Sequence, residues 1–129
     1  MKKYLTLLFL SAAFALAACA GQTESGPPPV TEPDEVIEVK AGEEFTITLE
    51  TNPNTGLHWE VAVELDATIL NVNNVRKEFV PDTAREGSPG VDVWTFTAIA
   101  PGETTITLGY YRGFSDAASR TLVFKIIVK

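Results

Sequence analysis

The sequence predicts an all-β protein, an immunoglobulin-like β-sandwich of seven to eight antiparallel strands. Apolar and polar residues alternate through residues 35–129, and no amphipathic helix of useful length appears there. The alternating runs are mostly β-branched and aromatic, and segments rich in turn-forming residues separate them. A stretch of about 95 residues is the usual size of one domain. Residues 35–129 are therefore expected to form a single β-domain.

The expected strands are, in chain order, residues 36–40, 44–51, 58–65, 69–80, 91–100, 103–111 and 120–128. The long run 69–80 is expected either to continue or to break near Asn73 and Asn74, which would give an eighth strand. The apolar residues that alternate along these runs are expected to face the core: Phe45, Ile47, Leu49, Trp59, Val61, Val63, Leu65, Trp94, Phe96, Ala98, Ile106, Leu108, Tyr110, Leu122, Phe124, Ile126 and Val128.

The connections differ between the two ends of this sandwich. If consecutive strands run antiparallel, three tight turns share one end: 41–43, 66–68 and 101–102. The other end then carries three longer loops, rich in Gly, Pro, Asn and Ser: 52–57, 81–90 and 112–119. Antibody variable domains use loops gathered at one end as a binding surface. The asymmetry favours recognition at this end, and tolerated insertions are the alternative explanation.

Residues 1–18 have the pattern of a bacterial lipoprotein signal peptide. Lys2 and Lys3 precede an apolar run, residues 5–15, that is shorter than the roughly 20 residues needed to span a bilayer. Residues 16–19 read Leu-Ala-Ala-Cys, a lipobox in which the Cys19 thiol receives the diacylglyceryl group. A buried free thiol and a signal peptide cleaved nearby without lipidation are the alternatives.

Residues 19–34 are expected to form a lipidated, proline-rich tether. Polyproline geometry of about 3.1 Å per residue would hold the domain roughly 45 Å from a membrane. The lipid would anchor the chain without a spanning helix. Because Cys19 is the only cysteine, no intramolecular disulfide can form. Ala20, rather than Asp, follows Cys19, so we expect an exported chain that a Gram-negative cell would sort to its outer membrane.

The charge of the chain excludes some partners. Removal of residues 1–18 takes away Lys2 and Lys3, which leaves 8 basic and 17 acidic residues and a net charge of about −9. Nucleic acid and anionic headgroups are poor partners for such a chain. A neutral or basic protein is the more plausible partner.

The first long loop, Asn52-Pro53-Asn54-Thr55-Gly56, has the composition of a rigid turn. Pro53 fixes its own φ and favours an extended Asn52, while Asn54 and Gly56 can adopt positive φ. Thr55 is then presented at the tip. A loop that is stiff before binding loses little entropy when it docks. A plain strand connector is the alternative.

The other two loops offer different groups. Gly87 and Gly90 flank Ser88 and Pro89 in the second loop and would let a partner approach the backbone closely. The third loop presents Arg112, Gly113 and Phe114. Arg and aromatic residues are favoured anchors at protein interfaces. A solvated Arg112 and a half-buried Phe114 that closes the sandwich are the alternative.

Enzyme chemistry is not expected. His58 is the only histidine, and nothing in the sequence brings it together with Ser88 or Ser115 and Asp116 as a catalytic triad. One histidine and no free cysteine argue against zinc. The scattered acidic residues lack the ordered spacing of a calcium loop. We therefore expect no metal, no cofactor and no catalytic residues.

The three loops, in this order, resemble those of the chagasin-like inhibitors of papain-like cysteine peptidases. The family pattern is an Asn-Pro-Thr-Thr-Gly loop, a Gly-x-Gly-Gly loop and an Arg-Pro-aromatic loop, and the resemblance covers most of residues 36–129. This chain matches at eight loop positions: Asn52, Pro53, Thr55, Gly56, Gly87, Gly90, Arg112 and Phe114. It departs at Asn54, Pro89 and Gly113. Trp59 and the Pro-Gly turn at 101–102 are also similar to the family.

The resemblance implies a reversible, non-covalent inhibitor whose three loops (52–57, 86–90 and 111–115) enter the peptidase cleft. The domain needs no partner to bury its core, so a monomer is expected. Thr55 and the backbone of residues 54–56 would cover the catalytic cysteine. The Gly87–Gly90 loop would lie along one wall, and Arg112 with Phe114 would pack on the other. The departures leave potency open, since Pro89 removes a backbone donor and Gly113 replaces a stiffening proline.

Two alternatives stay open. The domain could be a non-inhibitory envelope module that binds another envelope protein. It could also bind carbohydrate, with Tyr110, Tyr111 and Phe114 as a stacking platform. An inhibitor should depend on Thr55 and its turn, whereas a sugar-binding module should depend on the aromatic residues.

Overall fold

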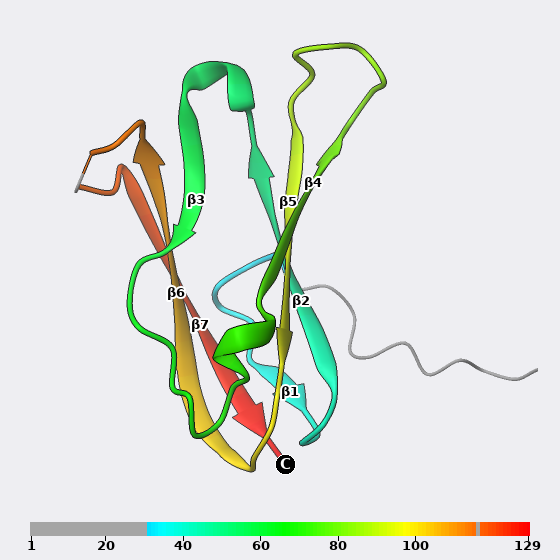
Figure 1. Cartoon of the computed structure of the whole chain (residues 1–129), viewed down its shortest axis with the longest axis vertical. Helices are drawn as coiled ribbons and strands as arrows, with labels where there is room; N and C mark the ends of the chain where they lie inside the picture. Colours follow the sequence, from blue (N-terminus) through cyan, green and yellow to red (C-terminus); the bar gives the residue numbers. More distant parts are fainter. Residues whose placement is uncertain (1–30, 116) are drawn as a thin grey trace, which may run out of the picture.

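Two β-sheets face one another around a common core in the computed structural model (Figure 1). The structure describes residues 31–115 and 117–129. The predictions for the signal peptide, for Cys19, for the tether up to Val30 and for Asp116 lie outside the described residues.

Seven strands and two short 3-10 helices make up the described chain. The strands are β1 (Ile37–Val39), β2 (Glu44–Thr51), β3 (Leu57–Val61), β4 (Arg76–Pro81), β5 (Gly90–Thr97), β6 (Gly102–Arg112) and β7 (Arg120–Val128). The 3-10 helices are η1 (Pro53–Thr55) and η2 (Val72–Asn74). The all-β sandwich expected from the sequence is confirmed.

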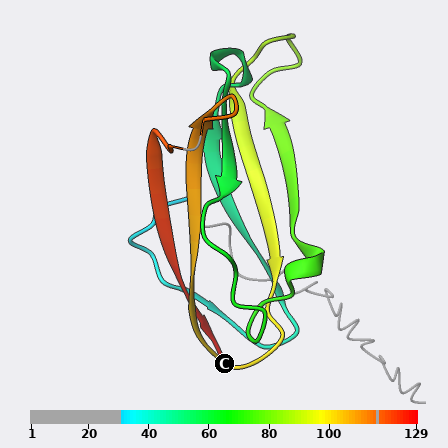
Figure 2. The same cartoon turned by 60° about the vertical axis from the view of Figure 1, so that its left-hand side comes forward.

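One sheet has the strand order β1-β7-β6-β3, and the other has the order β2-β5-β4. Figure 2 separates the two layers, with β6 and β7 in orange and red on one side and β4 and β5 in green and yellow on the other. All pairs are antiparallel except β1 and β7, which run parallel with Ile37 opposite Ile126. The expectation of a wholly antiparallel sandwich is wrong at this edge, because β1 joins the sheet opposite to that of β2.

The core lies between the sheets and is formed by the alternating positions of the strands. Trp59 and Trp94 are both buried in it, as predicted. Its most enclosed side chains are Trp59, Phe45, Phe96, Phe124, Ile37, Ile47, Leu70, Ile106, Leu108 and Ile126. All buried apolar residues of the described chain fall between Ile37 and Val128, so this part contains a complete core of its own.

Two strand predictions need correction. The expected strand 58–65 is the shorter β3, and Val63, expected in the core, is 58% exposed. The expected strand 69–80 breaks into a single bridge at Leu70, the turn η2 and strand β4, so no eighth strand forms. The break occurs because the Asn71 side chain accepts a hydrogen bond from the Asn73 backbone N–H at 3.1 Å and caps η2.

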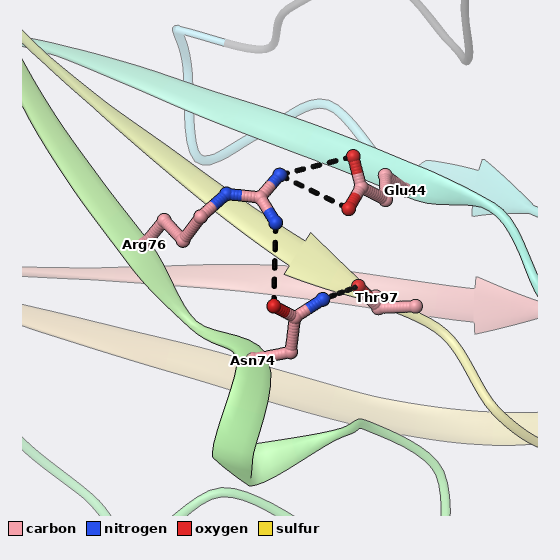
Figure 3. A network of polar contacts seen from close by, with 4 residues as sticks. All are labelled: Glu44, Asn74, Arg76 and Thr97. Atoms are coloured by element: carbon pink, nitrogen blue, oxygen red, sulfur yellow. Dashed lines mark hydrogen bonds and ion pairs between the residues drawn. The ribbon is translucent and has the colours of Figure 1, made fainter.

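A polar network fixes η2 and the start of β4 against the rest of the sheet (Figure 3). Arg76 donates to both carboxylate oxygens of Glu44 at 3.0 and 3.1 Å, and to the Asn74 side chain at 3.3 Å. Asn74 in turn donates to the Thr97 hydroxyl at 3.1 Å. Exposed ion pairs typically contribute about 0–1 kcal/mol, so this network sets the position of the edge strand more than it stabilises the fold.

Candidate loop-end binding site

The three long loops share one end of the sandwich, as their sequence predicts (Figure 1). They are the β2–β3 connection with η1, the β4–β5 loop and the β6–β7 loop. The turns after β1 and after β5 lie at the opposite end (Figure 1). The β3–β4 connection lies there too, but it runs over residues 62–75, so the tight connection expected at 66–68 is wrong: β3 ends early and η2 interrupts the next strand. The first loop lies between the other two (Figure 1).

The first loop is a closed, internally hydrogen-bonded turn. Asn52 is extended, and its side chain accepts from the Asn54 backbone N–H at 3.2 Å. Gly56 has a φ of +73° and donates its N–H to the Pro53 carbonyl at 3.3 Å. Asn54 does not adopt the positive φ that its side chain would allow, because it lies inside the 3-10 turn. Only Gly56 supplies the left-handed conformation that ends the turn.

The hydroxyl of Thr55 closes this turn. It donates to the Asn52 carbonyl at 2.8 Å and accepts from the Leu57 backbone N–H at 3.3 Å. The side chain is exposed at the loop tip. Thr55 is exposed at the tip, as predicted. Its hydroxyl also stabilises the conformation of the loop.

Two hydrogen bonds connect the first loop to the other two. The Asn54 side-chain amide donates to the carbonyl of Gly87 in the second loop. The Gly113 backbone N–H donates to the carbonyl of Gly56 at 3.1 Å. Both donors are positions where this chain departs from the chagasin-like pattern. These two residues, which differ from the family pattern, therefore connect the first loop to the other two.

The second loop is ordered by its own polar groups. The Ser88 hydroxyl contacts the Thr83 hydroxyl at 3.2 Å and donates to the Pro89 carbonyl at 2.9 Å. The Pro89 carbonyl also accepts from the Asp82 N–H at 2.9 Å. Gly87 has a φ of +79° at the exposed tip of the loop.

Gly90 is different from the other predicted contact residues, because it is buried at the start of β5. A Cβ atom there would lie 2.2 Å from the carbonyl oxygen of Val80 on the neighbouring strand. The need for glycine at this position comes from strand packing. Its direct contact with a partner remains a prediction.

The third loop carries the most exposed apolar side chain of the described residues. Phe114 is fully exposed, and Arg112 next to it is also exposed. The alternative of a half-buried Phe114 that closes the sandwich is therefore wrong. Gly113, with a φ of +56°, turns the chain between the two.

The two tyrosines before this loop face opposite sides of the sheet. Tyr110 points inward and stacks on Trp59 with ring centroids 4.7 Å apart. Tyr111 lies across Gly109 on the outer side, where a Cβ atom at Gly109 would be 2.6 Å from its ring. Tyr110, Tyr111 and Phe114 therefore do not form the shared stacking platform that the carbohydrate alternative requires.

The described residues show no assembled catalytic or metal site. His58 lies 3.8 Å from Glu60, and the Ser88 and Ser115 hydroxyls bond within their own loops. No group of three or more His, Cys, Asp or Glu residues in this part of the chain could hold a metal ion. Within residues 31–115 and 117–129, no helix is both long and apolar enough to cross a membrane.

A buried carboxylate lies just below the loop end. Asp92 on β5 is only 6% exposed and sits opposite Leu49 and Phe79 in the sheet. Loss of water raises its pKa above the usual value of 3.8, and nearby Glu60 adds to the rise. Lys77 and His58 act in the opposite direction.

The fold and the joined loops define a β-sandwich domain that presents three connected loops at one end. A family model for the chagasin family of peptidase inhibitors (I42) matches residues 38–128. The chain belongs to the chagasin family of peptidase inhibitors.

Individual relatives agree with this assignment. Amoebiasin-2 of Entamoeba histolytica is 28% identical over 85 residues, which are 64% of this chain and 68% of that protein. The solution structure of amebosin has 30% sequence identity and a TM-score of 0.63, and the match covers 80% of this chain and all of that one. A crystal structure of a cysteine protease inhibitor from Entamoeba histolytica has 23% identity and a TM-score of 0.61, and the match covers 78% of this chain and 94% of that one.

Proposed function

We propose that this chain is a reversible, non-covalent inhibitor of papain-like cysteine peptidases that inserts its three loops into the active-site cleft. Membership of a peptidase inhibitor family supports inhibition. A fold relative described as a cysteine protease inhibitor supports the class of target. The observation that carries the proposal is the connection of all three loops through Asn54 and Gly113.

The geometry suits occlusion of a cleft without cleavage. The turn formed by η1 is the central element, and the exposed Thr55 lies at its tip. A peptidase cleaves an extended backbone, whereas this segment is held in a 3-10 turn by the Thr55 hydroxyl. We propose that Thr55 and its neighbours cover the catalytic cysteine while remaining intact.

The flanking loops would grip the walls of the cleft. The backbone of the second loop at Gly87 and Ser88 would lie along one wall. Phe114, exposed in the free chain, would be buried against the other wall, with Arg112 beside it. Burial of one large apolar side chain contributes roughly 1.5–3 kcal/mol, so Phe114 is the expected anchor of the complex.

The test is inhibition of papain by residues 20–129, beside the variants Thr55→Ala, Thr55→Ser and Arg112→Ala. We expect tight, reversible inhibition by the unaltered chain and weaker inhibition by Thr55→Ala and Arg112→Ala. Thr55→Ser keeps the hydroxyl that closes the turn and should stay within about threefold of the unaltered chain. No inhibition of papain or of cathepsin-like enzymes by a well-folded domain would refute the proposal.

We also propose that the chain acts while anchored to the cell envelope. The Leu-Ala-Ala-Cys pattern at residues 16–19 supports lipidation of Cys19, and Ala20 favours the outer membrane of a Gram-negative cell. Metabolic labelling with a palmitate analogue tests this proposal. The unaltered chain should take up the label, and Cys19→Ser should not.

A further inference from the structure

The first and second loops are carried by strands that are not paired with each other. β3, which follows the first loop, is the last strand of one sheet, and β4, which precedes the second loop, is the last strand of the other. Within residues 31–115 and 117–129, no β-ladder joins these two strands. The distance between the bases of the two loops is therefore set by side-chain contacts.

Lys77 crosses from β4 to β3. It lies opposite Trp94 in the register of β4 and β5, so its side chain leaves the sheet on the same face as the buried Trp94. Its Nζ lies 5.2 Å from the centroid of the Trp94 ring and donates a hydrogen bond to the Trp59 backbone carbonyl on β3 at 3.0 Å. Glu60 is 3.6 Å away, but its carboxylate is half exposed, and such pairs contribute little. The hydrogen bond to Trp59 is thus the main polar contact of Lys77.

Trp59 carries this contact to both strands that hold the first loop. It lies on β3, just after the first loop ends at Gly56, and its indole N–H donates to the Glu50 carbonyl on β2 at 3.0 Å. Its ring stacks on Tyr110 of β6 and is almost fully buried. A displacement of the Trp59 backbone would therefore move the base of the first loop.

We infer that Lys77 is a positioning residue for inhibition, because through Trp59 it sets the first loop relative to the second. The inference rests on the proposed function. The Asn54 side-chain amide and the Gly87 carbonyl already connect the two loops at their tips. One connection leaves the loops free to pivot about it, whereas a second connection at their base fixes their relative orientation. A binding surface that is ordered before docking loses less entropy when it binds.

Protection of the sheet edge is the competing role for Lys77. β4 is an edge strand, and charged side chains that point inward from such strands prevent pairing with another chain. Edge protection acts on self-association and leaves the loops unchanged, whereas positioning acts on the first loop of the monomer. The two roles therefore differ in what a substitution of Lys77 changes.

Three variants of residues 20–129 separate these roles. Lys77→Met keeps the aliphatic part of the side chain and removes the donor, Lys77→Arg keeps a cationic donor, and Lys125→Met removes an exposed lysine on β7 of the other sheet. We expect the inhibition constant for papain to rise about three- to tenfold in Lys77→Met, the range for loss of one hydrogen bond. It should stay within about twofold of the unaltered chain in Lys77→Arg and in Lys125→Met.

NMR of the free, ¹⁵N-labelled proteins gives a second readout, which needs no peptidase. The side-chain amide signals of Asn54 should move towards those of a free asparagine in Lys77→Met, because the bond to Gly87 is then formed for less of the time. They should keep their positions in Lys77→Arg and in Lys125→Met. A lower thermal midpoint alone does not move these signals in the folded state.

Three results would overturn the inference: unchanged papain inhibition by Lys77→Met, unmoved Asn54 signals in that variant, or the same losses in Lys77→Arg. Self-association of Lys77→Met with unmoved Asn54 signals would assign the lysine to edge protection instead. Failure of the proposed function looks different, since the unaltered chain itself would then inhibit no papain-like peptidase. The NMR comparison would still show whether Lys77 positions the first loop.

Discussion

The backbone N–H of Gly113 donates a hydrogen bond to the carbonyl of Gly56 at 3.1 Å, which connects the third loop to the end of the first. The chagasin-like pattern has proline where this chain has Gly113, and proline has no N–H to donate. The φ of +56° at Gly113 is also closed to proline. In this chain, glycine at position 113 therefore orders the loop end through a hydrogen bond.

Restoring the family proline should weaken inhibition. Gly113→Pro removes a hydrogen bond that is worth about 0.5–1.5 kcal/mol, so we expect the inhibition constant for papain to rise about 2- to 12-fold. Gly113→Ala keeps the N–H and has open space for its Cβ, and it serves as the control for backbone strain. Tighter inhibition by Gly113→Pro than by the unaltered chain would contradict this account.

Asn54→Thr gives the family residue in the first loop and removes the bond from Asn54 to Gly87. We expect weaker inhibition by a few-fold, because the two loops must then be ordered during binding. The thermal midpoint should change little, since Asn54 is exposed. Inhibition constants and thermal unfolding, measured on both proteins, check this prediction. An equal or lower inhibition constant for Asn54→Thr would show that the connection is unimportant.

Gly90→Ala should destabilise the fold. The new Cβ would lie 2.2 Å from the Val80 carbonyl oxygen, and overpacking of this kind costs about 1–3 kcal/mol. Chemical denaturation of Gly90→Ala beside Gly87→Ala measures the effect, since Gly87→Ala carries the strain of a φ of +79° but meets only the Asn54 side chain, at 3.2 Å, and no strand backbone. If Gly90→Ala lowers the free energy of unfolding no more than Gly87→Ala does, close packing of Gly90 against the Val80 carbonyl is not what requires glycine there.

Asp92 makes stability depend on pH. Its folded pKa is raised above the unfolded value of 3.8, so the folded state holds the proton more tightly. The contribution of Asp92 to stability is then greatest below about pH 3.8, and this contribution is lost as the pH rises through the folded pKa. Asp92→Asn should therefore raise the thermal midpoint at pH 7, because the neutral amide loses less by burial than the charged carboxylate.

This gain from Asp92→Asn should shrink as the pH is lowered towards 3.8. Thermal unfolding of both proteins across pH 3–7 gives the comparison, with the exposed Glu64→Gln as the control. A lower midpoint for Asp92→Asn at pH 7 would show that attraction to Lys77 and His58 outweighs the loss of water around the Asp92 carboxylate.

The strands and the position of the loops could be predicted because they depend on local pattern. Alternation at Phe45, Ile47 and Leu49 identifies β2 without any tertiary information. The alternation of connections between antiparallel strands likewise predicts which loops share an end, whereas the expected difference in length fails at the β3–β4 connection, residues 62–75. The parallel pairing of β1 with β7 could not be predicted, because it joins segments from opposite ends of the domain.

The hydrogen bonds that connect the loops of the candidate site could not be predicted from the sequence either. The acceptor of the Asn54 side chain, Gly87, and the acceptor of the Gly113 N–H, Gly56, lie on other loops, and their approach depends on the packed sheets. The break at η2 had a partial signal, since Asn71 is a residue that caps turns. No sequence signal indicated that Gly90 is buried, because a glycine in a loop motif and a glycine in a crowded strand look the same in sequence.

The most direct test of the central claim compares binding to papain with an open and with a blocked cleft. Calorimetry would measure the affinity of residues 20–129 for free papain and for papain whose catalytic cysteine carries a covalent peptidyl inhibitor. If the three joined loops occupy the cleft, binding should be tight to the free enzyme and lost with the blocked one. Equal affinity for both forms would place the contact elsewhere on the peptidase and contradict the account.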